Sequence, residues 1–199
     1  MALFSSNERT RNPKAATSGP DFDQQGSDLC TECGICCAGA IFGHAVMRDS
    51  DDVEGLKAAG MAVYENSEGR PEYRLPCPKL DGACCTIYQI RPTVCRKFQC
   101  QLLVSVKNGR VPLDLALTKV EEAKALVECV KSLLRIHGDS DEEAPVIQRY
   151  LDLLEQNKEH SDRLEYQDRF GLLIEAANTW HAFRTRWFWD DDCEVVEED

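Results

Sequence analysis

The sequence predicts a mainly α-helical protein in which a small, irregular, cysteine-rich module is followed by a helical hairpin or three-helix segment. Nine of the 11 cysteines fall within residues 30–100, and this stretch has few long apolar runs. Helical periodicity begins only at about residue 112. The 199 residues, 43% of them hydrophobic, suffice for one domain of ordinary size or two small ones.

The two ends of the chain differ from the rest in composition. Residues 1–29 are rich in Ser, Asn, Thr, Gly, Pro and charge without periodicity, which predicts a mobile N-terminal arm. Residues 190–199 include seven acidic side chains and predict a solvated acidic tail. Between them we expect the cysteine-rich module over residues 30–110 and the helical segment over residues 111–189.

Within the module, the sequence predicts one short helix and one small strand pair. Ser50 or Asp51 can cap a helix that continues through Ala59, and Gly60 can end it.

Three long helices are expected beyond the module. Thr118 and Glu121 form a capping box that predicts the start of the first, and Gly138 follows its end. The second is expected from residue 140 or 141 and the third from about residue 161. Apolar side chains recur at helical spacing in all three and predict a packed core rather than a ligand platform. They are Val120, Ala123, Leu126 or Val127, Val130, Leu134, Val146, Tyr150, Leu153, Leu154, Phe170, Leu173, Ala177, Trp180, Phe183 and Trp187.

Charge and hydropathy exclude several functional classes. The net charge of -12 disfavours binding to nucleic acid or to an anionic membrane surface. The N-terminal residues contain no apolar segment of signal-peptide length, and no run approaches the 18 or more residues of a membrane span. We therefore expect a cytoplasmic protein whose cysteines are thiols or metal thiolates. The odd total of 11 cysteines also argues against a full set of internal disulfides.

The first cysteine block is Cys30, Cys33, Cys36 and Cys37. Gaps of two residues let a tight turn present two sulfurs to one metal, with backbone N–H groups directed at the sulfurs. Gly34 suits the positive φ that such a turn needs. Because Cys36 and Cys37 are adjacent, they cannot comfortably occupy two corners of one tetrahedron. We expect them to serve two metals, or one of them to face away from the site.

The second block contains Cys77, flanked by prolines, followed by Cys85, Cys95 and Cys100. Residues 71–110 carry seven Lys or Arg against two acidic residues, a local charge of +5 in an acidic chain. Two four-thiolate sites, each with a net charge of about -2, would be offset by that charge.

The two blocks together, C-x2-C-x2-C-C and P-C-P-x-L…C-x-I-Y-x-x-R-P-x-x-C-R-x-F-x-C, resemble the YkgJ-like cysteine-cluster proteins. This family is described as zinc- or iron-chelating and includes flagellin lysine N-methylase. The resemblance covers about residues 30–100. It implies metal ligation by eight cysteines: Cys30, Cys33, Cys36, Cys37, Cys77, Cys85, Cys95 and Cys100.

The remaining cysteines have no counterpart in the family pattern. We expect Cys84 to be a bystander, Cys129 to be a small residue on the buried side of a helix, and Cys193 to be a free thiol in the acidic tail.

Side chains near the cysteines are expected to support them. We expect Arg91 and Arg96 to donate to sulfur or to a turn carbonyl. Tyr88 and Phe98 are expected to pack over the site. His44, with no second histidine nearby, is expected to be an ordinary surface or core residue.

Three functions are compatible with these patterns. The first is a metal-binding protein whose thiolates hold zinc or iron, and the dense run with scattered partners favours an iron–sulfur cluster over zinc. The second is cluster-assisted protein-lysine methylation, which the resemblance implies, although no Gly-rich strand-to-helix loop for a nucleotide-like cofactor is present. The third is an interaction module that the metal staples together. Neither catalytic residues nor a protein partner can be assigned from the sequence.

Overall fold

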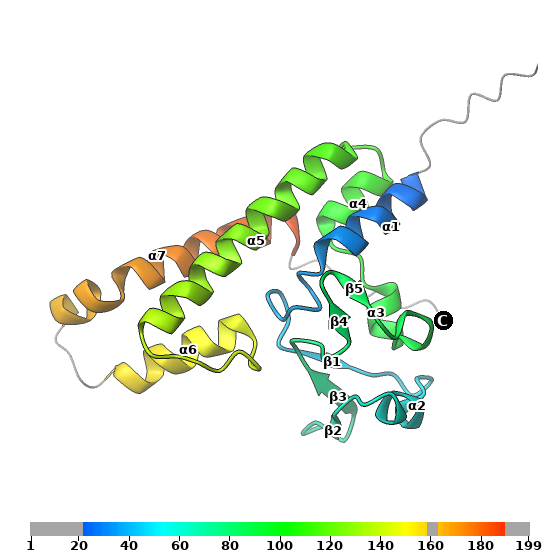
Figure 1. The fold of residues 1–199 in the computed structure, drawn as a ribbon, viewed down its shortest axis with the longest axis horizontal. Coiled ribbons are helices and arrows are strands. Elements are labelled where there is room, and N and C mark those ends of the chain that lie inside the picture. The colour runs from blue at the N-terminus through cyan, green and yellow to red at the C-terminus, as the bar shows by residue number, and fades with distance from the viewer. Residues whose placement is uncertain (1–21, 159–162, 190–199) are drawn as a thin grey trace, which may run out of the picture.

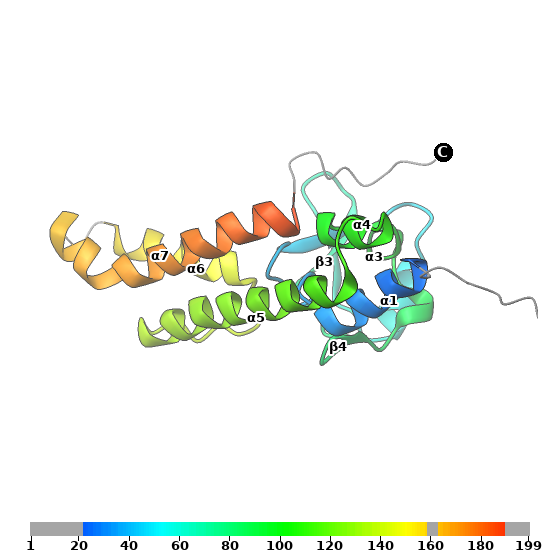
Figure 2. The same ribbon diagram turned by 90° about the horizontal axis from the view of Figure 1, so that it is seen from above.

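A computed structural model describes residues 22–158 and 163–189. Within these ranges the protein is mainly α-helical, as predicted. Short strands and helices form a compact head, and the long helices α5, α6 and α7 extend from it as an arm (Figures 1 and 2). No helix in the described ranges combines the length and the hydropathy required to cross a membrane.

The head contains more strands than the single pair that the sequence predicts. Three short strands form an antiparallel sheet in the order β1-β3-β2, and β4 pairs with β5. The elements are α1 (Phe22–Cys33), β1 (His44–Val46), α2 (Val53–Ala58), β2 (Val63–Glu65), β3 (Pro71–Arg74), β4 (Leu80–Asp81), β5 (Cys84–Cys85), a 3-10 turn (Tyr88–Ile90), α3 (Thr93–Lys97) and α4 (Gln101–Lys107).

The arm consists of α5 (Leu113–Ile136), α6 (Val146–Asn157) and α7 (Arg163–Trp187). The apolar side chains that the sequence places at helical spacing form a packed core, as predicted. With Val127 counted rather than Leu126, all but four of them are buried, and these four pack against the same core. Helix α5 begins earlier than predicted, since Pro112 caps it and the Thr118 hydroxyl donates to the Asp114 carbonyl inside the helix. Gly138, with a φ of +90°, follows its end as expected.

Three other sequence predictions are wrong. Helix α6 begins at Val146, after the N-cap Pro145, rather than at residue 140 or 141. Residues 22–29 lie in α1 rather than in an irregular arm, and Leu29 is buried in the core of the arm helices. Cys129 is exposed rather than buried, because the adjacent Val130 occupies the inward face of α5. The expected arm over residues 1–21, the start of the third helix near residue 161 and the acidic tail with Cys193 lie outside the described residues.

Two apolar cores position the cysteine-bearing segments. The larger joins the arm to α1 and α4, so packing is continuous across residue 110. The smaller lies under the three-stranded sheet and α2, around Met47, Leu56, Met61 and Tyr73. The predicted helix of the module is α2. Asp52 caps it by accepting the Gly55 N–H at 2.8 Å, one residue later than expected.

A buried ion pair holds the connection between α5 and α6. The guanidinium of Arg149 has a side-chain exposure of 1% and lies 2.6 Å from the Asp139 carboxylate and 3.0 Å from that of Glu142. Removal of one partner from such a pair leaves an uncompensated buried charge. The arm therefore has structural support that does not involve the cysteines.

Candidate metal centre

The eight cysteines of the family pattern fall into two spatial groups of four. In the first cysteine group, every pair of members interacts electrostatically, so that ionising one thiol raises the pKa of its neighbours. All pairs of the second cysteine group also interact electrostatically, and ionising Cys85 raises the pKa of the other three thiols. The first group is Cys30, Cys33, Cys36 and Cys100, and the second is Cys37, Cys77, Cys85 and Cys95.

The first cysteine group lies between two helices of the head that pack side by side (Figure 1). Cys30 and Cys33 occupy the last turn of α1, and Cys36 lies in the turn that follows. Cys100 caps α4, and its sulfur accepts the Leu103 N–H at 3.4 Å. Cys30 is the most exposed of the four and Cys100 is buried.

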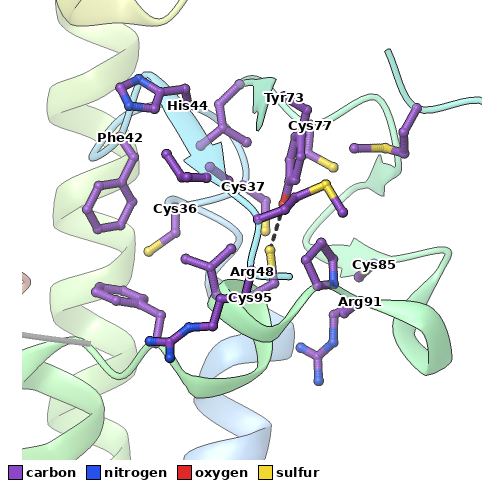
Figure 3. Close-up of a pocket in the computed structure, with 18 of the residues that line it drawn as sticks. Cys36, Cys37, Phe42, His44, Arg48, Tyr73, Cys77, Cys85, Arg91 and Cys95 are labelled. Atoms are coloured by element: carbon purple, nitrogen blue, oxygen red, sulfur yellow. Dashed lines mark hydrogen bonds between the residues drawn. The ribbon is translucent and has the colours of Figure 1, made fainter. Parts of the chain in front are cut away.

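The second cysteine group gathers one residue from each of four segments. Cys37 follows Cys36 in the turn, Cys77 follows β3, Cys85 ends β5, and Cys95 lies in α3. The Cys77 N–H donates to the Cys37 carbonyl at 2.7 Å, which ties the two chain segments together beside the sulfurs. Figure 3 shows these four side chains around one side of a cavity.

Two glycines allow these segments to approach one another. Gly34 and Gly39, with φ values of +67° and +71°, bracket the Cys36–Cys37 turn. A Cβ atom at Gly34 would lie 3.0 Å from the Ala83 Cα, and one at Gly39 would lie 3.1 Å from the Pro76 nitrogen. Both positions therefore require glycine on grounds of backbone conformation and of space. The positive φ that the sequence predicts for Gly34 is confirmed.

Burial disfavours the charged form of these thiols. It raises the pKa of Cys33 to about 11 and that of Cys37 and Cys100 to about 12, and it raises the pKa of Cys36 strongly. The thiols are therefore protonated at neutral pH in the absence of a cation that binds the sulfurs.

Other contacts favour thiolates and so favour metal ligation. Backbone N–H groups of Ile35, Lys79 and Leu103 donate to the sulfurs of Cys33, Cys77 and Cys100, respectively, and lower their pKa. The orientation of backbone N–H groups toward sulfur that the sequence predicts for the first block is confirmed at Cys33, and Cys77 and Cys100 of the second block show it as well.

Arg91 is the cation that both groups share. Its charge lowers the pKa of Cys30 in the first group and of Cys37 and Cys95 in the second. Its guanidinium also stacks on the Tyr88 ring, with 3.5 Å from Cζ to the ring centroid, and its Nε donates to the Tyr88 carbonyl. The predicted donation to a turn carbonyl is therefore confirmed for Arg91.

Arg96 does not perform the role that the sequence suggested. Its guanidinium donates to the Thr93 hydroxyl at 3.1 Å and faces the Asp51 carboxylate at 3.9 Å. Asp51 also accepts the backbone N–H and the hydroxyl of Thr93, both at 2.7 Å. These contacts anchor the start of the helix that carries Cys95.

Tyr73 is a contact of the second group that sequence reasoning missed. Its hydroxyl lies 2.7 Å from the Cys95 sulfur, and the residue is only 2% exposed. Burial raises the pKa of the Tyr73 phenol far above its ordinary value. The phenol therefore keeps its proton and can donate it to the sulfur of an ionised Cys95. Only the pairing of β3 with β1 and β2 brings it there, so no motif marks it.

The other predicted neighbours divide between the cavity and the surface. Phe98 lines the cavity and packs edge-to-face on Phe42 at 4.9 Å. Tyr88 is 51% exposed and covers no sulfur, so that its expected packing is wrong. His44 is a surface residue as expected. Cys84 is exposed, and its thiol donates to the Thr31 carbonyl at 3.9 Å.

A cavity of about 790 Å³ adjoins the second group and is reached also by Cys36 of the first (Figure 3). Among the described residues, no three His, Cys, Asp or Glu side chains stand close enough together to hold an ion in their present rotamers. The two groups are sets of neighbouring thiols, and metal binding by either group would require its sulfurs to move closer together.

Comparison with known proteins gives one match. The family model described as "CxxCxxCC: Putative zinc- or iron-chelating domain" matches residues 29–127. These residues form a CxxCxxCC domain. The CxxCxxCC match confirms the resemblance found in the sequence and extends it into α5. No curated protein and no solved structure matches the chain.

The thiols of the CxxCxxCC domain predict how the stability of the reduced, metal-free protein depends on pH. Since the folded pKa values lie above the ordinary value of 9.0, folding favours the protonated thiols. Their contribution is complete below pH 9 and is lost as the pH rises toward 11 or 12, at about 1.4 kcal/mol per pH unit for each such thiol. Urea unfolding at pH 8 and pH 10.5 should therefore give a lower free energy of unfolding at pH 10.5.

The matched controls are Cys100→Ser and Cys129→Ser. The decrease should be smaller in Cys100→Ser, which lacks one buried thiol, and unchanged in Cys129→Ser, which lacks an exposed one. Equal decreases in all three proteins would show that the buried thiols do not cause the effect.

Proposed function

We propose that the CxxCxxCC domain binds zinc or iron at two centres, each held by the four thiolates of one cysteine group. The division of eight cysteines from distant segments into two complete sets of four carries this proposal. Four sulfurs match the coordination number of a structural zinc ion and of an iron–sulfur cluster. The adjacent Cys36 and Cys37, one in each set, agree with service to two metals.

The donor set and its surroundings fit a metal. Thiolates are soft ligands that select zinc, Cu(I) and iron–sulfur clusters over magnesium or calcium. A four-thiolate site carries a net charge of about -2 with a divalent ion. Arg91 faces both groups, and Lys107 and Lys124 lower the pKa of Cys30 and Cys33 in the first. When bound, zinc would cross-link the segments, whereas an iron–sulfur cluster would add electron transfer.

Protein-lysine methylation is the second candidate, and the charges of the cavity count against it. Arg48 and Arg91 line the cavity together with Arg70, whose charge Glu68 neutralises, whereas Asp49 is the sole acidic lining residue in the described part of the chain. A substrate lysine would bring a positive charge to this surface and be repelled. The third candidate is a protein-interaction module whose segments are cross-linked by bound metal. It requires only that the metal joins these segments, and it is compatible with the two centres.

Single cysteine substitutions test the two-centre proposal. Cys33→Ser should remove the metal of the first group alone and Cys95→Ser that of the second alone, because a hydroxyl replaces thiolate poorly. Metal per chain, measured by mass spectrometry of the purified zinc-loaded protein, should fall from two to one in each variant.

The chain provides close controls for this measurement. Cys84→Ser, next to Cys85, and Cys129→Ser on α5 should retain both metals. Equal losses in Cys84→Ser and Cys85→Ser would contradict the assignment of the second group. Loss of both metals from either ligand variant would contradict two separate centres.

The Tyr73 hydroxyl should strengthen metal binding by the second group only. In Tyr73→Phe the Cys95 thiolate loses a hydrogen bond, and loss of such a supporting contact typically lowers metal affinity about 10-fold or more. Competition with a chromophoric chelator should show one weakened site and one unchanged site. Tyr64→Phe, on the neighbouring strand β2, is the control and should leave both unchanged. An unaltered affinity in Tyr73→Phe would mean that the hydroxyl does not act on the metal.

The identity of the metal can be read from protein purified without oxygen. The dense first block favours iron–sulfur, so we expect broad visible absorption that bleaches on reduction or in air. A colourless, redox-silent protein with stoichiometric zinc would contradict the iron–sulfur prediction and leave the two-centre proposal intact.

A further inference from the structure

We propose that the cavity beside the second cysteine group binds a small organic carboxylate with an apolar body. The site shares a wall with the metal centre, and to that extent the proposal rests on the proposed function. It goes beyond metal binding, because it assigns a second ligand and the side chains that recognise it.

The size of the cavity is the first observation. Its volume of about 790 Å³ lies within the range of roughly 300–1,000 Å³ typical of small-molecule sites. In the zinc-loaded protein, a zinc ion at one wall displaces no more volume than a water molecule, about 30 Å³. Most of the cavity therefore remains for another ligand.

The walls favour an apolar body. Met47 and Met61, which are 2% and 4% exposed, belong to the small core beneath the sheet and reach the cavity from one side. Phe42 and Phe98 contribute an aromatic pair from the other. Methionine side chains adapt their shape to a ligand at low cost, and aromatic rings contribute large apolar area.

The charges favour an anion. Arg70 is neutralised by Glu68 at 2.6 Å and contributes little. The guanidinium of Arg48, by contrast, is half-buried and makes no ion pair or hydrogen bond to any residue in the described ranges. Figure 3 shows the side chains of Arg48 and Arg91 on either side of Cys95 in this view.

A carboxylate satisfies these two arginines better than other groups do. Guanidinium binds carboxylate through two parallel N–H···O bonds, and a half-buried guanidinium without a partner is costly. Arg91 is already stacked on Tyr88, so we assign the bidentate contact to Arg48 and the longer-range attraction to Arg91. The ligand would place its carboxylate at Arg48 and its apolar body against the two methionines.

Three probes with the same ring and different charge test this assignment. Phenylacetate, phenylacetamide and phenethylamine are titrated into the zinc-loaded full-length protein, with binding followed by ¹⁵N-resolved NMR shifts. We expect phenylacetate to bind with a Kd on the order of 1 mM, as befits a fragment of this size. Phenylacetamide should bind at least about 10-fold more weakly, and phenethylamine more weakly still.

Variants connect the preference to Arg48. Arg48→Gln should reduce the affinity for phenylacetate about 10-fold, to that for the amide, whereas Arg48→Lys should retain part of the preference. Arg110→Gln, an exposed arginine outside the cavity, should change nothing. Equal binding of all three probes, or an unchanged preference in Arg48→Gln, would overturn the proposal.

Metal content measured on the same samples separates this proposal from the previous one. Two metals per chain without any preference for phenylacetate would overturn the carboxylate site alone. A preference that depends on Arg48 in protein that binds neither zinc nor iron would support the carboxylate site and overturn the metal centres.

Discussion

The close approach of the Cys36–Cys37 turn to the segment around Cys77 and Cys85 is the constraint on which the head depends. Gly34 and Gly39 make it possible, because both have a positive φ and a Cβ at either position would crowd the opposing backbone at 3.0 to 3.1 Å. The approach brings eight thiols together, and burial and mutual repulsion oppose the ionisation of Cys36 and Cys37 at its centre. Such a cluster is stable as neutral thiols or as thiolates around a cation. Without a metal, the buried thiols must stay protonated. A bound metal would allow them to ionise and would cross-link segments that are up to about 70 residues apart in the sequence.

The two cysteine groups differ in their surroundings, and the difference suits different tasks. The first lies between α1 and α4, whose inner faces belong to the core of the arm, and only Cys36 reaches the cavity. The second has Cys37, Cys77, Cys85 and Cys95 all on the cavity wall. Closed thiolate sites stabilise folds, while sites beside a cavity can meet a ligand. We therefore associate the first group with the joining of head to arm and the second with the proposed carboxylate ligand.

Much of the fold follows from local patterns. The periodic stripe from Val120 to Trp180 becomes the core of the arm, since a helix with one apolar face can be stable only by burying it. The boundaries were less accurate. Pro112 begins α5 ahead of the capping box at Thr118, because a helix that packs on α1 and α7 extends as far as its tertiary contacts support it. Helix α1 was not predicted, because its sequence is mostly polar and the burial of Leu29 depends on contacts with α4 and α5.

The sequence by itself determined that two cysteine blocks lie within residues 30–100, and its resemblance to the YkgJ-like proteins implied which eight cysteines belong together. It also indicated that the adjacent Cys36 and Cys37 should serve two metals, or that one of them should face away from the site. Only the tertiary structure decided how the eight divide. It places Cys100 in the first cysteine group and Cys37 in the second. It alone brought Tyr73 to Cys95, and it left the Arg48 guanidinium beside a cavity without an ion pair or hydrogen bond to any described residue. The physical reason is that the spacing of cysteines along the sequence is fixed by the covalent chain. Contacts between β3, α3 and the loop after β1 depend instead on strand pairing and on the burial of distant apolar side chains.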